Sequence, residues 1–256
     1  TEGDSAKAFA ISGLSVVGRD YYGVFPLRGK LLNVREATTK QLMDNAEINA
    51  LKQIIGLQHG KEYTSLDELR YGSIEILTDA DVDGSHIKGL IINFIHTFWP
   101  SLLKFESFVQ AMVTPVLKAT KKGEEHSFYT VTDYNVWKDT KTCKGKSYTI
   151  KYYKGLGTST AAEAKEYFRN KSQNTICYHE TAESSKHITL AFKKDRADSR
   201  KQWILDGIQR QETMEYTGNN QKVNYSEFIN KDLIQFSIAD VERSIPSMVD
   251  GLNPSQ

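Results

Sequence analysis

The stretch IEILTDADVDGSHIKGL at residues 74–90 constrains the fold more than any other part of the chain. A largely apolar run ends in three aspartates at every second position, Asp79, Asp81 and Asp83, and Gly84 follows them. A short apolar run bounded by turn residues is typical of a buried strand. Open α/β sheets bind their ligands in the loops at the carboxyl ends of such strands. The stretch therefore predicts a buried strand that leads into an acidic ligand site.

Three interpretations of this acidic loop are open. One is a calcium loop, but the twelfth position, where an EF-hand needs a bidentate Glu, is Leu90, and a strand instead of a helix precedes the loop. Another is a solvated turn that caps the next helix, because Asp and Gly favour turns and N-caps for local reasons. The third is a site for Mg²⁺ or Mn²⁺, since closely spaced carboxylates repel one another and hard cations prefer oxygen ligands.

Strand and helix patterns alternate along most of the chain, which predicts an α/β fold with a largely parallel sheet. Helices are expected at residues 5–14, 45–55, 85–99, 161–168 and 196–208. Strands are expected at residues 21–27, 73–79, 147–155 and 187–192, and a hairpin around Gly123 is expected to join residues 109–120 to 126–131. Thr158 or Ser159 is expected to cap the helix that follows, and the polar stretch 218–224 is interpreted as an exposed connection.

The composition is that of a soluble globular chain with one large domain or two smaller ones, at 256 residues, 39% hydrophobic and 25% charged. No stretch reaches the roughly 18 to 20 uncharged apolar residues of a membrane span, and the N-terminus lacks a signal-peptide pattern, so no membrane partner is expected. Cys143 and Cys177 lie far apart without a CxxC, which indicates neither a zinc site nor a disulfide scaffold. The net charge of +1 means that any nucleic-acid binding must come from local clusters of Lys and Arg.

A further acidic residue and a cluster of cations lie near the start of the chain. Glu2 precedes the first expected helix and could sit at a strand end, facing the aspartates across the sheet, although alone it is no better than an N-capping turn. Four cationic or amide residues lie around Gly29, namely Arg28, Lys30, Asn33 and Arg35. Side chains of these types, clustered in this way, bind phosphates without reading the base sequence. In isolation, a solvated polar loop is the simpler explanation of that cluster.

The stretch YYKGLGTST at 152–160 offers another candidate cation, Lys154. Gly155 and Gly157 would let a phosphate approach the backbone, but a lone GxG is a weak signal. The GKS at 145–147 resembles the end of a P-loop, yet the motif requires glycine at position 140, which is Thr140. The sequence therefore predicts no ATP site.

Two short motifs and four longer blocks together resemble a known family. EGDSA at 2–6 and DADVDG at 79–84 resemble the two acidic motifs of the TOPRIM domain, a metal-dependent phosphoryl-transfer fold. The blocks that resemble the eukaryotic type IIA DNA topoisomerases in particular are PLRGKLLNVREA at 26–37, DGSHIKGLIINFIHTFWPSLL at 83–103, YYKGLGTST at 152–160 and ERSIPSMVDGL at 242–252. Two stretches depart from the family. DADVDG stands where the animal and fungal enzymes have DQDQDG. DGLNPSQ stands where they have DGLKPGQ, so Asn253 replaces a basic residue.

The resemblance implies a division of the chain into three parts. They are a TOPRIM metal-binding domain at 1–170 with a Rossmann-like sheet and a hairpin insertion near 107–146, an α/β extension and connection at 171–224, and the beginning of a winged-helix DNA-cleavage domain at 225–256. It implies an ATP-dependent enzyme in which a tyrosine cleaves both strands of a duplex, a second duplex passes, and the break is religated. None of the thirteen tyrosines matches the family's nucleophile, and the ATPase module would lie upstream, so the chain is expected to be an inactive fragment that needs ATP only as part of the full-length enzyme.

The resemblance also implies roles for single residues. Glu2 and Asp79 would bind the ion nearer the scissile phosphate, and Asp79 with Asp81 the second ion, so these three are the expected catalytic residues, with Mg²⁺ or Mn²⁺ as cofactor. Asp83 would orient the loop or bind metal through water, with a helix N-cap as the alternative. The expected DNA-binding residues are Arg28, Lys30, Asn33, Lys154 and Gly155.

The implied partners are double-stranded DNA and a second copy of the full-length chain in a homodimer, and the implied location is the nucleus, with a mitochondrial or viral origin as alternatives. Two other hypotheses are a non-catalytic DNA-binding module that keeps the acids for structure, and another TOPRIM enzyme such as a nuclease or primase. Metal-dependent DNA affinity would separate the first of these from the leading hypothesis. The blocks RSIPSMVDGL and PLRGK count against the second.

Overall fold

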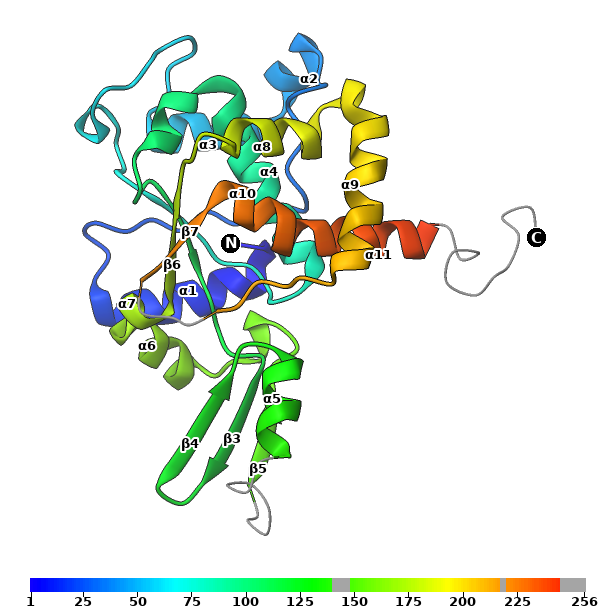
Figure 1. The fold of residues 1–256 in the computed structure, drawn as a ribbon. Coiled ribbons are helices and arrows are strands. Elements are labelled where there is room, and N and C mark those ends of the chain that lie inside the picture. The colour runs from blue at the N-terminus through cyan, green and yellow to red at the C-terminus, as the bar shows by residue number, and fades with distance from the viewer. Residues whose placement is uncertain (140–147, 217–219, 245–256) are drawn as a thin grey trace.

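A computed structural model of the chain describes residues 1–139, 148–216 and 220–244 (Figure 1). Its α-helices are α1 (Gly3–Val17), α2 (Thr39–Asp44), α3 (Ala46–Ile55), α4 (Val82–Phe98), α5 (Val131–Lys138), α6 (Ala161–Arg169), α7 (Lys171–Asn174), α8 (Ser184–Phe192), α9 (Ala197–Arg210), α10 (Tyr225–Glu227) and α11 (Ile234–Ser244), with a π-helix, η5 (Phe228–Leu233), between the last two. Its strands are β1 (Ile74–Ile76), β2 (Val109–Met112), β3 (Leu117–Lys121), β4 (Glu124–Phe128), β5 (Thr149–Tyr152), β6 (Thr175–His179) and β7 (Gln221–Asn224). Some residues of the sequence analysis lie outside the described ranges, namely Thr140, Cys143, the GKS at 145–147, Asn253 and the end of the block 242–252.

The central sheet has the strand order β1-β2-β6-β7. β1 pairs with β2 in parallel, β2 with β6 antiparallel, and β6 with β7 in parallel. The sheet is therefore mixed but mostly parallel, and helices precede and follow its strands. This arrangement confirms the predicted α/β fold class. None of the helices in the described ranges is long and apolar enough to cross a membrane.

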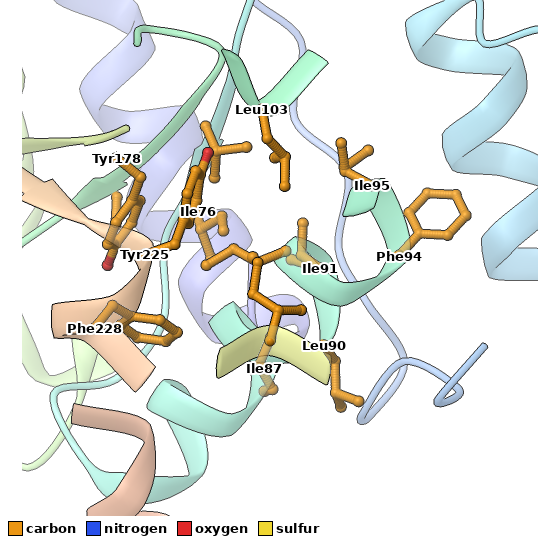
Figure 2. Close-up of a cluster of buried hydrophobic side chains, with 14 of the residues drawn as sticks. Ile76, Ile87, Leu90, Ile91, Phe94, Ile95, Leu103, Tyr178, Tyr225 and Phe228 are labelled. Carbon is orange, nitrogen blue, oxygen red and sulfur yellow. The ribbon is translucent and has the colours of Figure 1, made fainter. Parts of the chain in front are cut away.

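Helix α4, which follows the acidic loop, lies in the middle of the main hydrophobic core (Figure 2). Its apolar side chains point in several directions, as expected of a helix that is covered on most of its surface. Figure 2 shows Ile76 of β1 and the aromatic rings of Tyr178, Tyr225 and Phe228 together on one side of the helix, while the ring of Phe94 points away on the other side. The helix is thus fixed on several sides, and so is the position of the loop at its N-terminus.

Residues 225–244 pack into this same core through α10, η5 and α11. Tyr225, Phe228 and Ile229 are fully buried there, and α11 lies against α4 and α9. Figure 1 shows the segment crossing the body of the molecule beside α9. The predicted domain boundary at residue 225 stays a prediction.

A second sheet, with the order β4-β3-β5, projects from the body of the molecule together with α5 (Figure 1). β3 and β4 form the predicted hairpin around Gly123, whose φ of 82° suits a tight turn. The first arm, expected as one strand at 109–120, is divided, because β2 joins the central sheet and only β3 joins the hairpin. Pro115 lies between them and has no N–H to donate to a strand ladder, which explains the interruption.

Three other predictions of secondary structure were wrong. Residues 187–192 form the end of helix α8 instead of a strand, because Ser184, Ile188 and Phe192 recur every four residues on its buried face. The expected strand at 21–27 is an extended segment in which only Leu27 makes a bridge, to Glu2. The expected connection at 218–224 contains β7, which the sequence concealed because Val223 is its only fully buried side chain.

Candidate metal and nucleic-acid site at the acidic loop

Glu2 lies beside the carboxyl end of β1. Its backbone N–H donates to the carbonyl of Leu77 (3.0 Å), and the N–H of Gly3 donates to the carbonyl of Leu27 (3.2 Å), so the start of the chain is held between two extended segments. Helix α1 begins immediately afterwards and packs on α6, chiefly through Phe9 against Phe168. The Glu2 carboxylate accepts a hydrogen bond from the backbone N–H of Asp79 (3.2 Å). The structure thus brings Glu2 to the acidic loop, as its sequence context suggested.

The three aspartates of the loop have different surroundings. Oδ1 of Asp79 accepts from the backbone N–H of Leu156 (2.8 Å). Asp81 is the N-cap of α4, and its Oδ1 accepts from the N–H of Gly84 (2.8 Å). Asp83 lies in the first turn and pairs with Lys30, whose Nζ is 2.7 Å from Oδ1. The interpretation of Asp83 as the N-cap was therefore wrong, because the helix begins at Val82 and Asp81 takes that position.

The acids repel one another. Burial, followed by the charges of Asp79, Asp81 and Asp83, raises the pKa of Glu2, although the hydrogen bond from the Asp79 N–H acts in the opposite direction. Carboxylate oxygens are the donors that Mg²⁺ prefers, so the chemistry of this set fits a hard divalent cation. As the side chains stand, however, no three metal-ligating groups within the described residues are arranged to hold an ion. The site is a set of suitable donors that would have to close around a metal.

A loop at residues 155–158 packs directly on Asp79. An ideal Cβ added to Gly155 would lie 2.3 Å from Oδ2 of Asp79, closer than any side chain can approach. Glycine is required here by this close contact, since its φ of −179° is ordinary extended backbone. Sequence reasoning suggested that Gly155 leaves room for a phosphate, whereas the structure shows that it leaves room for the Asp79 carboxylate.

Glu163 anchors this loop, and sequence reasoning missed it. Its carboxylate accepts from Lys151 (2.8 Å), from the Tyr153 hydroxyl (2.5 Å) and from the N–H of Thr160 (2.7 Å). These bonds outweigh burial, which acts in the opposite direction, and lower the pKa of Glu163 to about 2. A signal was present, because Thr160 and Glu163 form the T-x-x-E of a capping box at the start of α6. Thr160 thus takes the capping role predicted for Thr158 or Ser159.

Some of the predicted cations are exposed near the acidic loop, and others are not. Arg28, Lys30 and Lys154 are exposed. Lys30 also lies over the ring of Phe236 (4.7 Å) and, with burial opposing it, lowers the pKa of Asp83. Arg243 of α11 approaches the same carboxylate, at 3.6 Å from Oδ2 of Asp83.

Asn33 and Arg35 turn away from this exposed group. The Asn33 amide donates to the carbonyl of Phe192 (2.9 Å) and accepts from Asn93 (3.0 Å), which is fully buried. Arg35 donates from Nε to Asn93 (2.6 Å) and also contacts His96. Asn33 therefore joins the segment after residues 21–27 to α4 and α8, and Arg35 joins it to α4. The predicted DNA contact of Asn33 stays a prediction.

Two family models together match most of the chain. A family model of the Toprim domain matches residues 1–111, and a model of the C-terminal associated domain of TOPRIM matches residues 112–241. DNA topoisomerase 2 of Drosophila melanogaster is 53% identical, DNA topoisomerase 2-beta of Gallus gallus 54%, and DNA topoisomerase 2 of Arabidopsis thaliana 51%. Each alignment covers 100% of this chain and only 16 to 18% of the relative.

One solved structure resembles the fold closely. It is the Plasmodium falciparum topoisomerase II DNA-binding, cleavage and re-ligation domain, which matches with a TM-score of 0.89 and 48% identity over 95% of this chain and 33% of that chain. These matches confirm the family resemblance of the acidic motifs and longer blocks. The chain therefore belongs to the eukaryotic type II DNA topoisomerase family and contains its Toprim domain and the C-terminal associated domain of TOPRIM.

Proposed function

We propose that this chain is the metal-binding part of a type II DNA topoisomerase, which cleaves both strands of a DNA duplex, passes a second duplex through the break and religates it. The observation that carries the proposal is the meeting of Glu2 with Asp79 and Asp81 at the carboxyl end of β1. The relatives that match the whole chain at 51 to 54% identity are named DNA topoisomerase 2 or 2-beta, and the chain spans 16 to 18% of their length.

The proposed chemistry needs positive charge next to a phosphodiester. During transfer, negative charge accumulates on the phosphate oxygens, and Mg²⁺ or Mn²⁺ supplies the charge that stabilises it. Glu2 and Asp79 would hold the ion nearer the scissile phosphate, and Asp79 with Asp81 would hold the other. Glu2, whose pKa is raised, is also suited to hold a proton near the leaving 3′-oxygen. Asp83, already paired with Lys30, would orient the loop.

The rest of the reaction is assigned to other parts of the enzyme. The nucleophilic tyrosine and the ATPase site would come from outside these 256 residues, and a homodimer would bring the tyrosine of one subunit to the acids of the other. We also propose that the enzyme acts in the nucleus. By itself, the chain would bind metal and DNA and neither cleave nor relax a duplex.

Metal-dependent DNA binding tests the proposal. If the acids hold cations between the protein and the phosphates, affinity for a short duplex should be several-fold higher in Mn²⁺ than in chelator, because bound cations replace carboxylate repulsion of the DNA with attraction. Fluorescence anisotropy at constant ionic strength measures the difference. Equal affinity in both conditions would instead favour a DNA-binding module that keeps the acids only for structure.

Lys30 offers a separate test of the DNA surface. Lys30→Ala should weaken binding to all sequences alike and reduce the slope of log K against log salt by about 0.9, the share of one phosphate. Lys186→Ala is a matched control, because Lys186 is also an exposed lysine in an ion pair, with Glu183 at 3.0 Å. If both variants showed the wild-type slope, Lys30 would leave the list of phosphate contacts.

A further inference from the structure

A buried ionic network lies directly behind the acidic loop. Asp232 of η5 accepts hydrogen bonds from Nζ of Lys88 (2.8 Å), Oγ of Ser85 (2.7 Å) and the hydroxyl of Tyr216 (2.8 Å). The side chains of Lys88 and Asp232 are only 12% and 14% exposed. The three donors satisfy the carboxylate with strong, charge-assisted hydrogen bonds. Although burial acts in the opposite direction, these donors lower the pKa of Asp232, so the group is charged at neutral pH.

This network reaches the loop through Ser85. The backbone N–H of Ser85 donates to the carbonyl of Asp81 (3.1 Å), and the preceding N–H, of Gly84, donates to the Asp81 carboxylate (2.8 Å). The Ser85 hydroxyl lies 2.7 Å from Asp232 and 3.2 Å from the Asp81 carbonyl. A hydroxyl has one proton, and an ionised carboxylate is the stronger acceptor, so the bond to Asp232 dominates. Asp232 is therefore one residue removed from a proposed metal ligand.

The helical segment that contains Asp232, residues 228–244, also contacts the start of α4 through residues that follow Asp232 in the sequence. The ring of Phe236 stacks on His86 with centroids 3.8 Å apart and an interplanar angle of 23°. Arg243 reaches Asp83, as described above. Segment 228–244 therefore holds consecutive turns of α4 by an ionic, an aromatic and a second ionic contact.

Stability alone does not explain the Lys88–Asp232 pair. Taking two charges out of water is costly, and well-packed apolar residues in their place are often equally stable or more so. What an ion pair with directed hydrogen bonds adds is a defined geometry. Asp232 also lies in a π-helix, a rare form that is frequent at functional sites.

We propose that Asp232 is a positioning residue for the acidic loop: through Ser85 and Lys88 it fixes the first turns of α4 and so holds Asp81 beside Glu2 and Asp79. This inference rests on the proposed metal role of Asp81. It assigns a function to a residue of the C-terminal helical segment that lies outside the acidic loop and contacts Ser85 and Lys88 of α4.

Two variants test it by different routes. Ser85→Ala removes the link and leaves the ion pair, whereas the double variant Lys88→Met with Asp232→Leu removes the network and leaves no unpaired buried charge. Both are expected to speed amide exchange of Gly84 and Ser85 in chelator by about tenfold and to weaken Mn²⁺ binding by about tenfold. Glu227→Gln is the matched control, because it breaks an ion pair between α10 and segment 228–244, with Lys231 at 2.9 Å, and is expected to change neither the exchange nor the Mn²⁺ affinity.

The two readouts separate this inference from the proposed function. If the double variant and Ser85→Ala keep wild-type exchange at Gly84 and Ser85 and wild-type Mn²⁺ affinity, Asp232 has no positioning role. If the wild-type chain binds no Mn²⁺, the proposed metal function fails, while faster exchange in the variants still supports the link from Asp232 to the loop. The expected result for the double variant is faster exchange at these two amides with a melting temperature no lower than that of the wild type, because the loss of a purely stabilising pair would lower the melting temperature.

Discussion

Replacing Asp79 by alanine is expected to raise the dissociation constant for Mn²⁺ by about 100-fold or more, equivalent to roughly 2.7 kcal/mol. Asp79 is the proposed ligand common to both ions, and it is the acid whose backbone meets Glu2 and whose carboxylate meets the loop at Leu156. A site for a hard cation loses affinity steeply with each charged ligand that is removed. Isothermal titration calorimetry with Mn²⁺ measures the change.

Asp83→Ala is the matched control for this experiment. It removes the same group from the same loop, but its carboxylate is already paired with Lys30, so Mn²⁺ affinity should fall much less than in Asp79→Ala. The test is which of the two variants loses more Mn²⁺ affinity. If Asp79→Ala bound Mn²⁺ as tightly as the wild type, or if Asp83→Ala lost more affinity, the assignment of ligands would be wrong.

A substitution at a neighbouring residue should displace the Asp79 carboxylate without removing it. Gly155→Ala keeps every acid but places a Cβ 2.3 Å from Oδ2 of Asp79, which forces the carboxylate to move, so it should reproduce most of the loss of Mn²⁺ affinity. Gly72→Ala controls for the general effect of replacing glycine, because a Cβ at that position would meet nothing within 4 Å. Wild-type affinity in Gly155→Ala would show that Asp79 does not need its present position to bind metal.

Local patterns in the sequence were sufficient to predict the core of this site. The apolar run before Asp79 and the alternating acids are contiguous, so β1, the loop and the start of α4 could be predicted together. Glu2 could be placed only conditionally, because its position depends on a bridge to Leu27 and a hydrogen bond to Leu77. The family resemblance, which joined the two motifs, supplied what local pattern could not.

The supporting residues could not be predicted because their partners are distant in the chain. Ser85 and Asp232 are 147 positions apart, and Leu156 is 77 positions from Asp79. Nothing near Asp232 in the sequence indicates that it will be buried against α4. The error at 187–192 has the same origin, since Ile188 and Thr189 favour strands locally but the fit of Ile188 and Phe192 into the core decides for a helix.

Glu2→Gln is expected to have opposite effects on stability and on metal binding. Without metal, partial burial and repulsion by the aspartates raise the pKa of the half-buried Glu2 above the usual 4.5. A raised pKa means that Glu2 favours folding most at pH values below 4.5 and that this contribution is lost as the pH rises through the folded-state pKa. Glutamine keeps an acceptor for the Asp79 N–H without the charge, so in chelator at pH 7 the variant should melt at a higher temperature than the wild type.

The gain should shrink as the pH falls through the raised pKa and disappear below 4.5, because the wild-type carboxyl is then protonated as well. In Mn²⁺ the order should reverse, since the variant has lost a charged ligand and is expected to bind the ion about 10- to 100-fold more weakly. Calorimetric melting curves in chelator and in Mn²⁺ at several pH values measure both effects, and Asp4→Asn, an exposed acid of the same motif, serves as the control. A wild-type chain that melted above Glu2→Gln in chelator at pH 7 would contradict the repulsion. A site strained in this way when empty gains stability on binding metal, which is the behaviour expected of acids retained for catalysis at some cost to the fold.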